Sequence, residues 1–205
     1  MNDRNSAQKL TNRAFAIVER GRQEHRKGNF EVSRQLLEEA LRSIDIALEA
    51  DPDYEHAYNE RSFVLGNLQR YEEAAACSRK AILLAPEVPK FHIGLIAIGI
   101  EHIRSLKSRK ERKSAAEPYF ADIEKLMKRF PKYPSTYLAR AALQAMTDVG
   151  QSAWEESLSK AAKRYFKMVK ISSGEPASEA GIAEALKANT HNCLELQREW
   201  DRLPD

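Results

Sequence analysis

The sequence is poor in the residues that cross-link or interrupt a chain. It has 2 cysteines, 8 glycines and 8 prolines among 205 residues. Cys77 and Cys193 are too few to form a disulfide framework, so we expect reduced thiols and a cytoplasmic location. The scarcity of glycine and proline argues against long disordered tails.

Long apolar segments are also missing. The start, MNDRNSAQKL, is polar and has no apolar core, so we expect no signal peptide. The longest apolar run, residues 91–100, covers about half of the length that a membrane-spanning helix needs. We therefore expect no insertion into a membrane.

Motifs of catalysis and of cofactor or metal binding are absent as well. The sequence contains no HExxH, CxxC, GxxxxGK[ST], GxSxG or GxGxxG. A zinc site would have to start from His191 and Cys193, and one short pair falls short of the ligand spacing of structural zinc sites. Acidic pairs such as Glu72 and Glu73 are adjacent in sequence and point in different directions on a helix. We predict a protein that is not an enzyme and binds no cofactor or metal.

The charged residues are numerous but balanced. Lysine and arginine number 33, aspartate and glutamate 30, and the net charge is +3. This balance suits a soluble protein and gives no overall signature of nucleic-acid binding.

The clearest pattern lies in residues 55–88, EHAYNERSFVLGNLQRYEEAAACSRKAILLAPEV. Large and small side chains follow one another along it in a fixed order, and a proline closes the stretch. These residues are Tyr58, Ser62, Leu65, Tyr71, Ala74, Ala81 and Pro86. This order resembles the tetratricopeptide (TPR) repeat, a helix-turn-helix unit. Two places depart from the repeat, because Arg61 stands where it prefers leucine and Ser78 where it prefers a large aromatic residue. Since one hairpin cannot bury its own apolar face, the pattern implies further repeats.

The same places recur one repeat earlier, where Ile17, Gly21, Phe30 and Ala40 take the positions of Tyr58, Ser62, Tyr71 and Ala81. This predicts helices at 7–27 and 30–50 around a turn at Gly28 and Asn29, with Asn29 as a plausible N-cap. Asp51 or Asp53 can cap the next helix, and Ser135 a later one. Ser114 and Glu117 fit a capping box and predict a helix start there, after the basic stretch.

Together these patterns predict one domain over residues 1–205 with an all-α fold, a right-handed α-solenoid of TPR repeats with a C-terminal capping helix. We expect repeat 1 at 7–53 with a lengthened second helix and repeat 2 at 54–87. An irregular repeat 3 with a basic insertion is expected at 88–132, a degenerate repeat 4 at 134–171, and the capping helix at 176–202.

The resemblance also implies where a partner would bind, because the first helix of each TPR repeat lines the concave face. Carried onto this chain, that face comprises Phe15, Val18, Arg22, His25, Arg26, His56, Asn59, Phe63, Asn67, Phe91 and Glu101. Exposed phenylalanine and arginine are common anchors of protein interfaces. The alternatives are that the phenylalanines complete the packing between helices, or that the final helix fills the groove.

A second candidate surface is the basic segment, residues 104–113, with Arg104, Lys107, Arg109, Lys110, Arg112 and Lys113. It suits an acidic partner, a nucleic-acid backbone or an anionic surface, although it contains no aromatic residue that would stack on bases. The alternative is a solvated helix end.

The leading hypothesis is therefore a non-catalytic adaptor or scaffold that binds a protein or peptide of unknown identity on the concave face. Nucleic-acid binding through residues 104–113 and self-assembly into a homo-oligomer are the alternatives. The carboxylate clamp with which some TPR proteins hold a chaperone tail is not expected, because Glu60 occupies one of its places and would repel a carboxylate.

Overall fold

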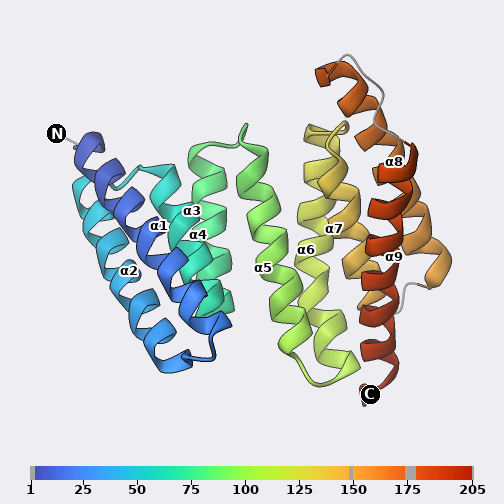
Figure 1. Cartoon of the computed structure of the whole chain (residues 1–205), viewed down its shortest axis with the longest axis horizontal. Coiled ribbons are helices and arrows are strands. Elements are labelled where there is room, and N and C mark those ends of the chain that lie inside the picture. The colour runs from blue at the N-terminus through green and yellow to red at the C-terminus, as the bar shows by residue number, and fades with distance from the viewer. Residues whose placement is uncertain (1–2, 148–149, 174–178, 205) are drawn as a thin grey trace. The chain divides into compact units, whose positions relative to one another are not determined.

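The computed structural model describes residues 3–147, 150–173 and 179–204, including their side chains except those of 165–173, 179–183, 185 and 186. All regular structure within these residues is helical (Figure 1). The helices are α1 (Arg4–Arg26), α2 (Phe30–Ala50), α3 (Glu55–Asn67), α4 (Tyr71–Leu84), α5 (Pro89–Ser105), α6 (Arg109–Arg129), α7 (Pro134–Ala145), α8 (Gln151–Ser173) and α9 (Glu179–Asp201). The chain divides into two compact units, residues 1–98 and 99–205, and the boundary falls within α5. The repeat bounds expected from the sequence stay a prediction.

The first unit is built from helical hairpins. α1 packs along α2 and α3 along α4, while α3 also packs against α1 and α2. Ile17, Leu37, Ile44 and Leu65 are buried in one apolar cluster at their centre. Burial of each such side chain stabilises the fold by about 1.5–3 kcal/mol.

The turn between α1 and α2 depends on a glycine. Gly28 has a φ of 84°, in the left-handed region that other residues adopt at a cost. The turn that the sequence predicted at Gly28 and Asn29 is confirmed, and so is the long second helix over residues 30–50.

The second unit has its core around α7 and α8, which pack along each other, with α6 against α7. Trp154, Ile123 and Leu143 are fully buried there. α9 follows this last hairpin and packs against both of its helices, as expected of a capping helix. The apolar spacing of the sequence also predicts that Ile182 and Leu186 share the inner face of that helix, and these two side chains lie outside the described ones.

The predicted helix starts were less accurate than the helices themselves. α6 begins at Arg109, because Ser108 and not Ser114 is its N-cap. The Ser108 Oγ accepts a hydrogen bond from the Glu111 backbone N–H (3.3 Å), and the Glu111 carboxylate accepts one from the Ser108 N–H (3.2 Å). This capping box satisfies two N–H groups at the helix start.

The other predicted caps are not formed by side chains. Asn29 makes no side-chain cap for α2, and its Nδ2 donates instead to the Glu24 carboxylate (2.7 Å). α3 and α7 are preceded by Tyr54 and Tyr133, neither of which forms a side-chain cap hydrogen bond.

Candidate functional site

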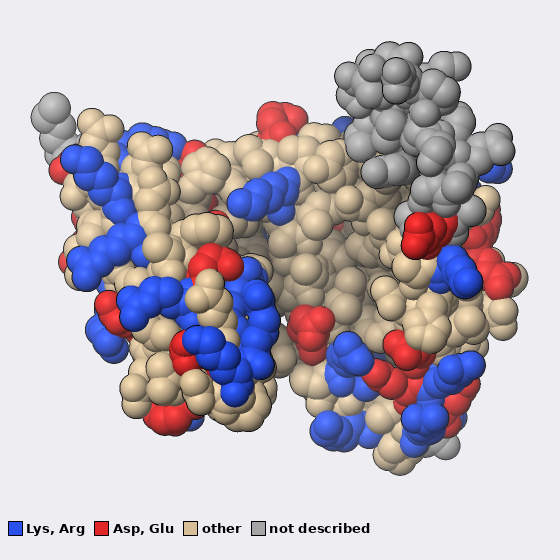
Figure 2. Space-filling view, in the orientation of Figure 1, with Lys and Arg blue, Asp and Glu red and all other residues tan. Residues whose placement is uncertain are grey.

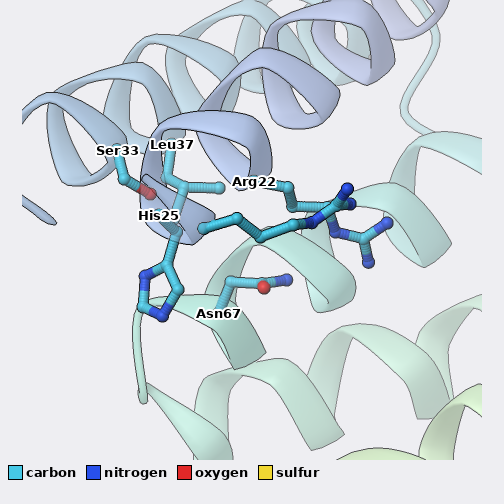
Figure 3. A pocket seen from close by; sticks show the side chains of 6 residues that line it. Arg22, His25, Ser33, Leu37 and Asn67 are labelled. Carbon is cyan, nitrogen blue, oxygen red and sulfur yellow. The ribbon is translucent and has the colours of Figure 1, made fainter. Parts of the chain in front are cut away.

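A pocket of about 260 Å³ lies on the first unit, where α1 ends, α2 begins and α3 ends (Figure 3). Its walls are Arg22, His25 and Arg26 from α1, Ser33 and Leu37 from α2, and Asn67 from α3. Cationic and polar side chains therefore predominate, and no carboxylate is among these lining residues.

Arg22 is held in place from two sides. Its Nη1 donates to Glu19 Oε1 (2.7 Å) within α1. Its guanidinium carbon lies 4.2 Å from the ring centroid of Phe63 in α3, a cation–π contact. Arg22 lines the pocket, and the Phe63 side chain on which it stacks remains 37% exposed beside it.

The other polar groups of the pocket have neighbours of their own. The His25 ring meets the Phe30 ring edge to face, with centroids 4.9 Å apart. Asn67 Nδ2 donates to the Phe63 carbonyl (2.7 Å). These contacts fix the positions of the His25 and Asn67 side chains at the pocket.

Four residues of the concave-face prediction converge here: Arg22, His25, Arg26 and Asn67. Ser33 and Leu37 were missed, because they belong to the second helix of the hairpin. The sequence signal for them is Gly21, a residue without a side chain inside α1. A Cβ added there would lie 3.4 Å from the Ser33 carbonyl oxygen, so the glycine allows α2 to come close. Close approach of the two helices brings the first turns of α2 to the pocket.

Three other predicted contact residues are buried. Val18 and Phe91 are 1% and 0% exposed, so they complete the packing between helices, the alternative that the sequence left open for the phenylalanine. Asn59 is 8% exposed, and its Nδ2 donates to the Glu60 carboxylate (3.2 Å). For these three the expectation of partner contact is corrected: their side chains are part of the interior.

The remaining predicted residues are exposed. Phe15 is 51% exposed on α1, and His56 on α3 packs its ring against Phe91 with centroids 5.4 Å apart. Glu101 is exposed but belongs to the second unit. The aromatic part of the candidate surface therefore consists of Phe15 and Phe63.

Sequence reasoning overlooked a row of cations on α1. Lys9, Arg13 and Arg20 are exposed, and the described residues offer none of them a hydrogen bond or an ion pair. Figure 2 shows lysine and arginine gathered along α1, most densely toward its C-terminal end. Their signal is helical spacing, since Lys9 and Arg13 are four residues apart and Arg13 and Arg20 seven, about one and two helical turns.

No protein-family model matches the sequence, and a comparison with curated proteins also finds no match. Solved structures do match. The structure of TTC0263, a thermophilic TPR protein of Thermus thermophilus, aligns with 92% of this chain and 97% of its own, at 17% identity and a TM-score of 0.53. This chain has the TPR fold. MamA of Desulfovibrio magneticus RS-1 aligns at 15% identity and a TM-score of 0.46 over 92% of this chain and 97% of that one. The fold class predicted from the repeat pattern is confirmed.

Within the TPR fold of this chain, the basic segment 104–113 has partners in the second unit. Arg104 forms a forked ion pair with Glu199 of α9 (3.2 and 2.7 Å). Arg109 donates from its backbone to the Pro204 carbonyl (2.8 Å) and from Nη2 to the Asp201 carbonyl (2.9 Å). The segment thus holds the end of the capping helix.

The same end of the TPR array buries a tryptophan and an arginine. Trp200 is 2% exposed, with the charged groups of Arg109 and Lys113 at 5.8 and 5.4 Å from its ring. Arg112 is 4% exposed and donates to the carbonyls of Arg104 (2.9 Å) and Leu106 (3.2 Å) at the end of α5. Its burial lowers the pKa of the guanidinium. Lys107 and Lys110 are exposed.

A second pocket, of about 320 Å³, lies in the second unit between α5, α7 and α9. It is lined by Ile100, Arg104, Leu138, Ala142, Asn189, Asn192, Cys193, Glu195 and Leu196. Burial raises the pKa of the Cys193 thiol to about 11. A thiol with such a pKa is protonated at neutral pH and is a poor nucleophile or metal ligand.

Among the described residues, no group of three or more histidines, cysteines or carboxylates is placed to hold a metal ion. No helix in the same part of the chain is long and apolar enough to cross a membrane.

Proposed function

We propose that this TPR chain is a non-catalytic scaffold that binds a peptide or protein segment on the α1 and α3 face of its first unit. The observation that carries the proposal is the exposed Phe63 ring, stacked with Arg22 beside an open pocket. Arginine and aromatic side chains next to a concavity are typical of interface anchors. A cytoplasmic location, expected from the cysteine content, belongs to the same proposal.

Affinity capture from a cell lysate tests this function. The groove variant Phe15→Ala/Phe63→Ala removes the two exposed rings of α1 and α3. The matched control Ile46→Ala/Leu83→Ala removes two other exposed apolar side chains, 52% and 73% exposed, from the second helices α2 and α4. We expect proteins that the wild type and the control retain and the groove variant loses. Identical sets of retained proteins for all three would refute the proposed site.

Binding of nucleic acid or another anionic partner through residues 104–113 has less support. Arg104, Arg109 and Arg112 already contact the second unit's own carboxylate and carbonyl groups. Homo-oligomer formation stays a prediction, which light scattering over a range of protein concentrations tests.

A further inference from the structure

We infer that the partner segment is acidic, and that one of its aspartate or glutamate side chains enters the pocket beside Arg22 and Arg26. This inference rests on the proposed function and names the chemistry of its partner. Three features of the first unit support it: the lining of the pocket, the charge of α1 and the state of the aromatic rings.

The lining of the pocket is suited to a carboxylate. Arg22 and Arg26 supply guanidinium groups, while His25, Ser33 and Asn67 supply further polar groups. Arg26 is exposed and finds no hydrogen-bond or ion-pair partner among the described residues. A guanidinium binds a carboxylate through two parallel N–H donors, which makes this pair strong and directional.

Arg22 is pre-organised for such a contact. The Glu19 carboxylate and the Phe63 ring hold its guanidinium, so less side-chain entropy is lost when a ligand binds. A pocket of about 260 Å³ is smaller than typical sites for drug-sized molecules and fits a single side chain. The Phe63 ring, which contacts Arg22, is then available to the residues that flank this side chain.

The charge of α1 favours the approach of an acidic partner from solution. Lys9, Arg13 and Arg20 add three exposed cations without ion-pair partners among the described residues. The two acidic residues of α1, Glu19 and Glu24, are already paired with Arg22 and Lys27, both at 2.7 Å. The excess of positive charge on α1 attracts an anionic segment from solution and speeds its association.

The aromatic rings favour a peptide over single-stranded nucleic acid. Base stacking needs free ring faces. One face of Phe63 is covered by the Arg22 guanidinium. Phe15 and the rest of Phe63 offer contact area for apolar side chains that flank an acidic residue.

Selection from a random dodecapeptide display library on the full chain tests the inference. The pocket variant is Arg22→Gln/Arg26→Gln. Its matched control is Arg13→Gln/Arg20→Gln, which removes the same charge from α1 outside the pocket. Helical content and thermal midpoint, measured by circular dichroism, establish that all baits are folded, and Arg22→Lys/Arg26→Lys tests whether charge alone suffices.

We expect the wild type to enrich peptides with aspartate or glutamate beside an apolar residue. Fluorescence anisotropy with synthetic copies should then show at least tenfold weaker binding to the pocket variant and less than threefold weaker binding to the control. Replacing the acidic residue of the peptide by its amide should have the effect of the pocket variant. Partial recovery by the lysine variant would fit, because lysine keeps the charge but loses the planar donor pair.

The other outcomes separate the two claims. Enriched peptides that need Phe63 but carry no acidic residue would overturn the acidic partner and leave the proposed function standing. Equal weakening by the pocket variant and its control would overturn the pocket as the binding point. Displacement of the peptides by single-stranded DNA at equal concentration, lost in the pocket variant, would overturn the peptide as partner. Failure to enrich any peptide over the Phe15→Ala/Phe63→Ala variant would count against the proposed function itself.

Discussion

At the scale of single residues, Arg61 connects three helices of the first unit. From α3 its Nε donates to Asp45 Oδ1 in α2 (2.9 Å), and its Nη1 donates to Cys77 Sγ in α4 (3.2 Å). Burial by itself lowers the pKa of this guanidinium, but the hydrogen bonds to Asp45 and Cys77 outweigh it and raise the pKa. The arginine occupies the place at which the TPR pattern prefers leucine, so a polar link replaces an apolar contact.

We expect Arg61→Ala to lower the free energy of unfolding by about 1–2 kcal/mol, because it removes the hydrogen bonds to Asp45 and Cys77 from a side chain that is only 24% exposed. Urea denaturation measures the change. Arg70→Ala is the control, since its pair with Glu73 is exposed on both sides and such pairs contribute less than about 1 kcal/mol. Equal effects of the two substitutions would contradict the role of Arg61, and a double-mutant cycle with Asp45→Asn would give the coupling directly.

The Cys193 thiol gives a pH-dependent prediction. Burial raises its pKa to about 11 from an ordinary 9.0. Below pH 9 the thiol is protonated in the folded and in the unfolded chain. As the pH rises from 9 through 11 the thiol of the unfolded chain ionises first, so the free energy of unfolding falls in this range. We expect iodoacetamide to label Cys193 at pH 8 only after urea unfolds the second unit. We also expect Cys193→Ala to lose less stability than the wild type between pH 9 and 11, and rapid labelling of the folded chain would show that the thiol is not buried.

The sequence predicted some of the pocket residues correctly and assigned other, buried residues to the same face. Arg22, His25, Arg26 and Asn67 were found because the repeat assigns first-helix positions to the concave face. Val18 and Phe91 were assigned to the same face by the same rule, yet they are 1% and 0% exposed. The repeat pattern does not separate the two groups, because burial at one register position depends on neighbouring helices whose distance the sequence does not give.

At the scale of elements, two glycines differ in how closely another helix approaches them. A Cβ added at Gly99 in α5 would lie 2.5 Å from the Tyr119 ring of α6, closer than any real contact. A Cβ at Gly66 in α3 would meet only Ile98 Cγ1, at 3.6 Å. Tyr119 is 4% exposed, so its ring cannot move away without displacing the side chains around it.

We therefore expect opposite signs for the two alanine substitutions. Gly99→Ala should destabilise the second unit by about 1–3 kcal/mol through overpacking. Gly66→Ala should be neutral or stabilise by up to about 1 kcal/mol, because alanine is the better helix former. Thermal unfolding followed by circular dichroism compares them, and a stable Gly99→Ala protein would show that α5 and α6 are not in close contact at this point.

Helix boundaries show why elements were easier to predict than their ends. The apolar spacing that gave 30–50 is repeated over many residues, so one wrong assignment changes little. A cap depends on one side chain, and both Ser108 and Ser114 are followed three residues later by a glutamate. The sequence alone does not choose between these two capping boxes, since the choice depends on where α5 ends.

At the scale of the whole molecule, the contacts of the basic segment join distant parts of the sequence. Arg104 reaches Glu199 across 95 residues, and Arg109 reaches Asp201 across 92. Local patterns indicate a cluster of cations but not that a helix end far along the chain contacts it. The fold class was predictable because repeats contact their neighbours in sequence. The contacts of the basic segment were not predictable, because they are made with α9, which is not its neighbour in sequence.

The neighbour-to-neighbour contacts of a TPR fold lead to a prediction about cooperativity. In each unit the described helices pack mainly on those next in sequence, as α2 does on α1 and α3, and α8 on α7 and α9. Stability in such an array is a sum of repeat and interface terms, so a local loss spreads only as far as the coupling between repeats carries it.

Two buried side chains, one in each unit, test this expectation by hydrogen–deuterium exchange. Trp154 is 0% exposed, and its Nε1 donates to Gln197 of α9 (2.9 Å); Ile44 of α2 is also 0% exposed. Trp154→Ala should lower the free energy of unfolding by about 3–5 kcal/mol. It should accelerate amide exchange in α7 and α9 and change the rates in α1 and α2 by no more than a factor of about two, because each repeat is coupled most strongly to its neighbours. Ile44→Ala should accelerate exchange in α1, α2 and α3 and spare α7 and α9. Faster exchange throughout the chain after either substitution would contradict this expectation and mean that the two units unfold as one. Only strong coupling across α5 would let the loss of one buried side chain destabilise the repeats far from it.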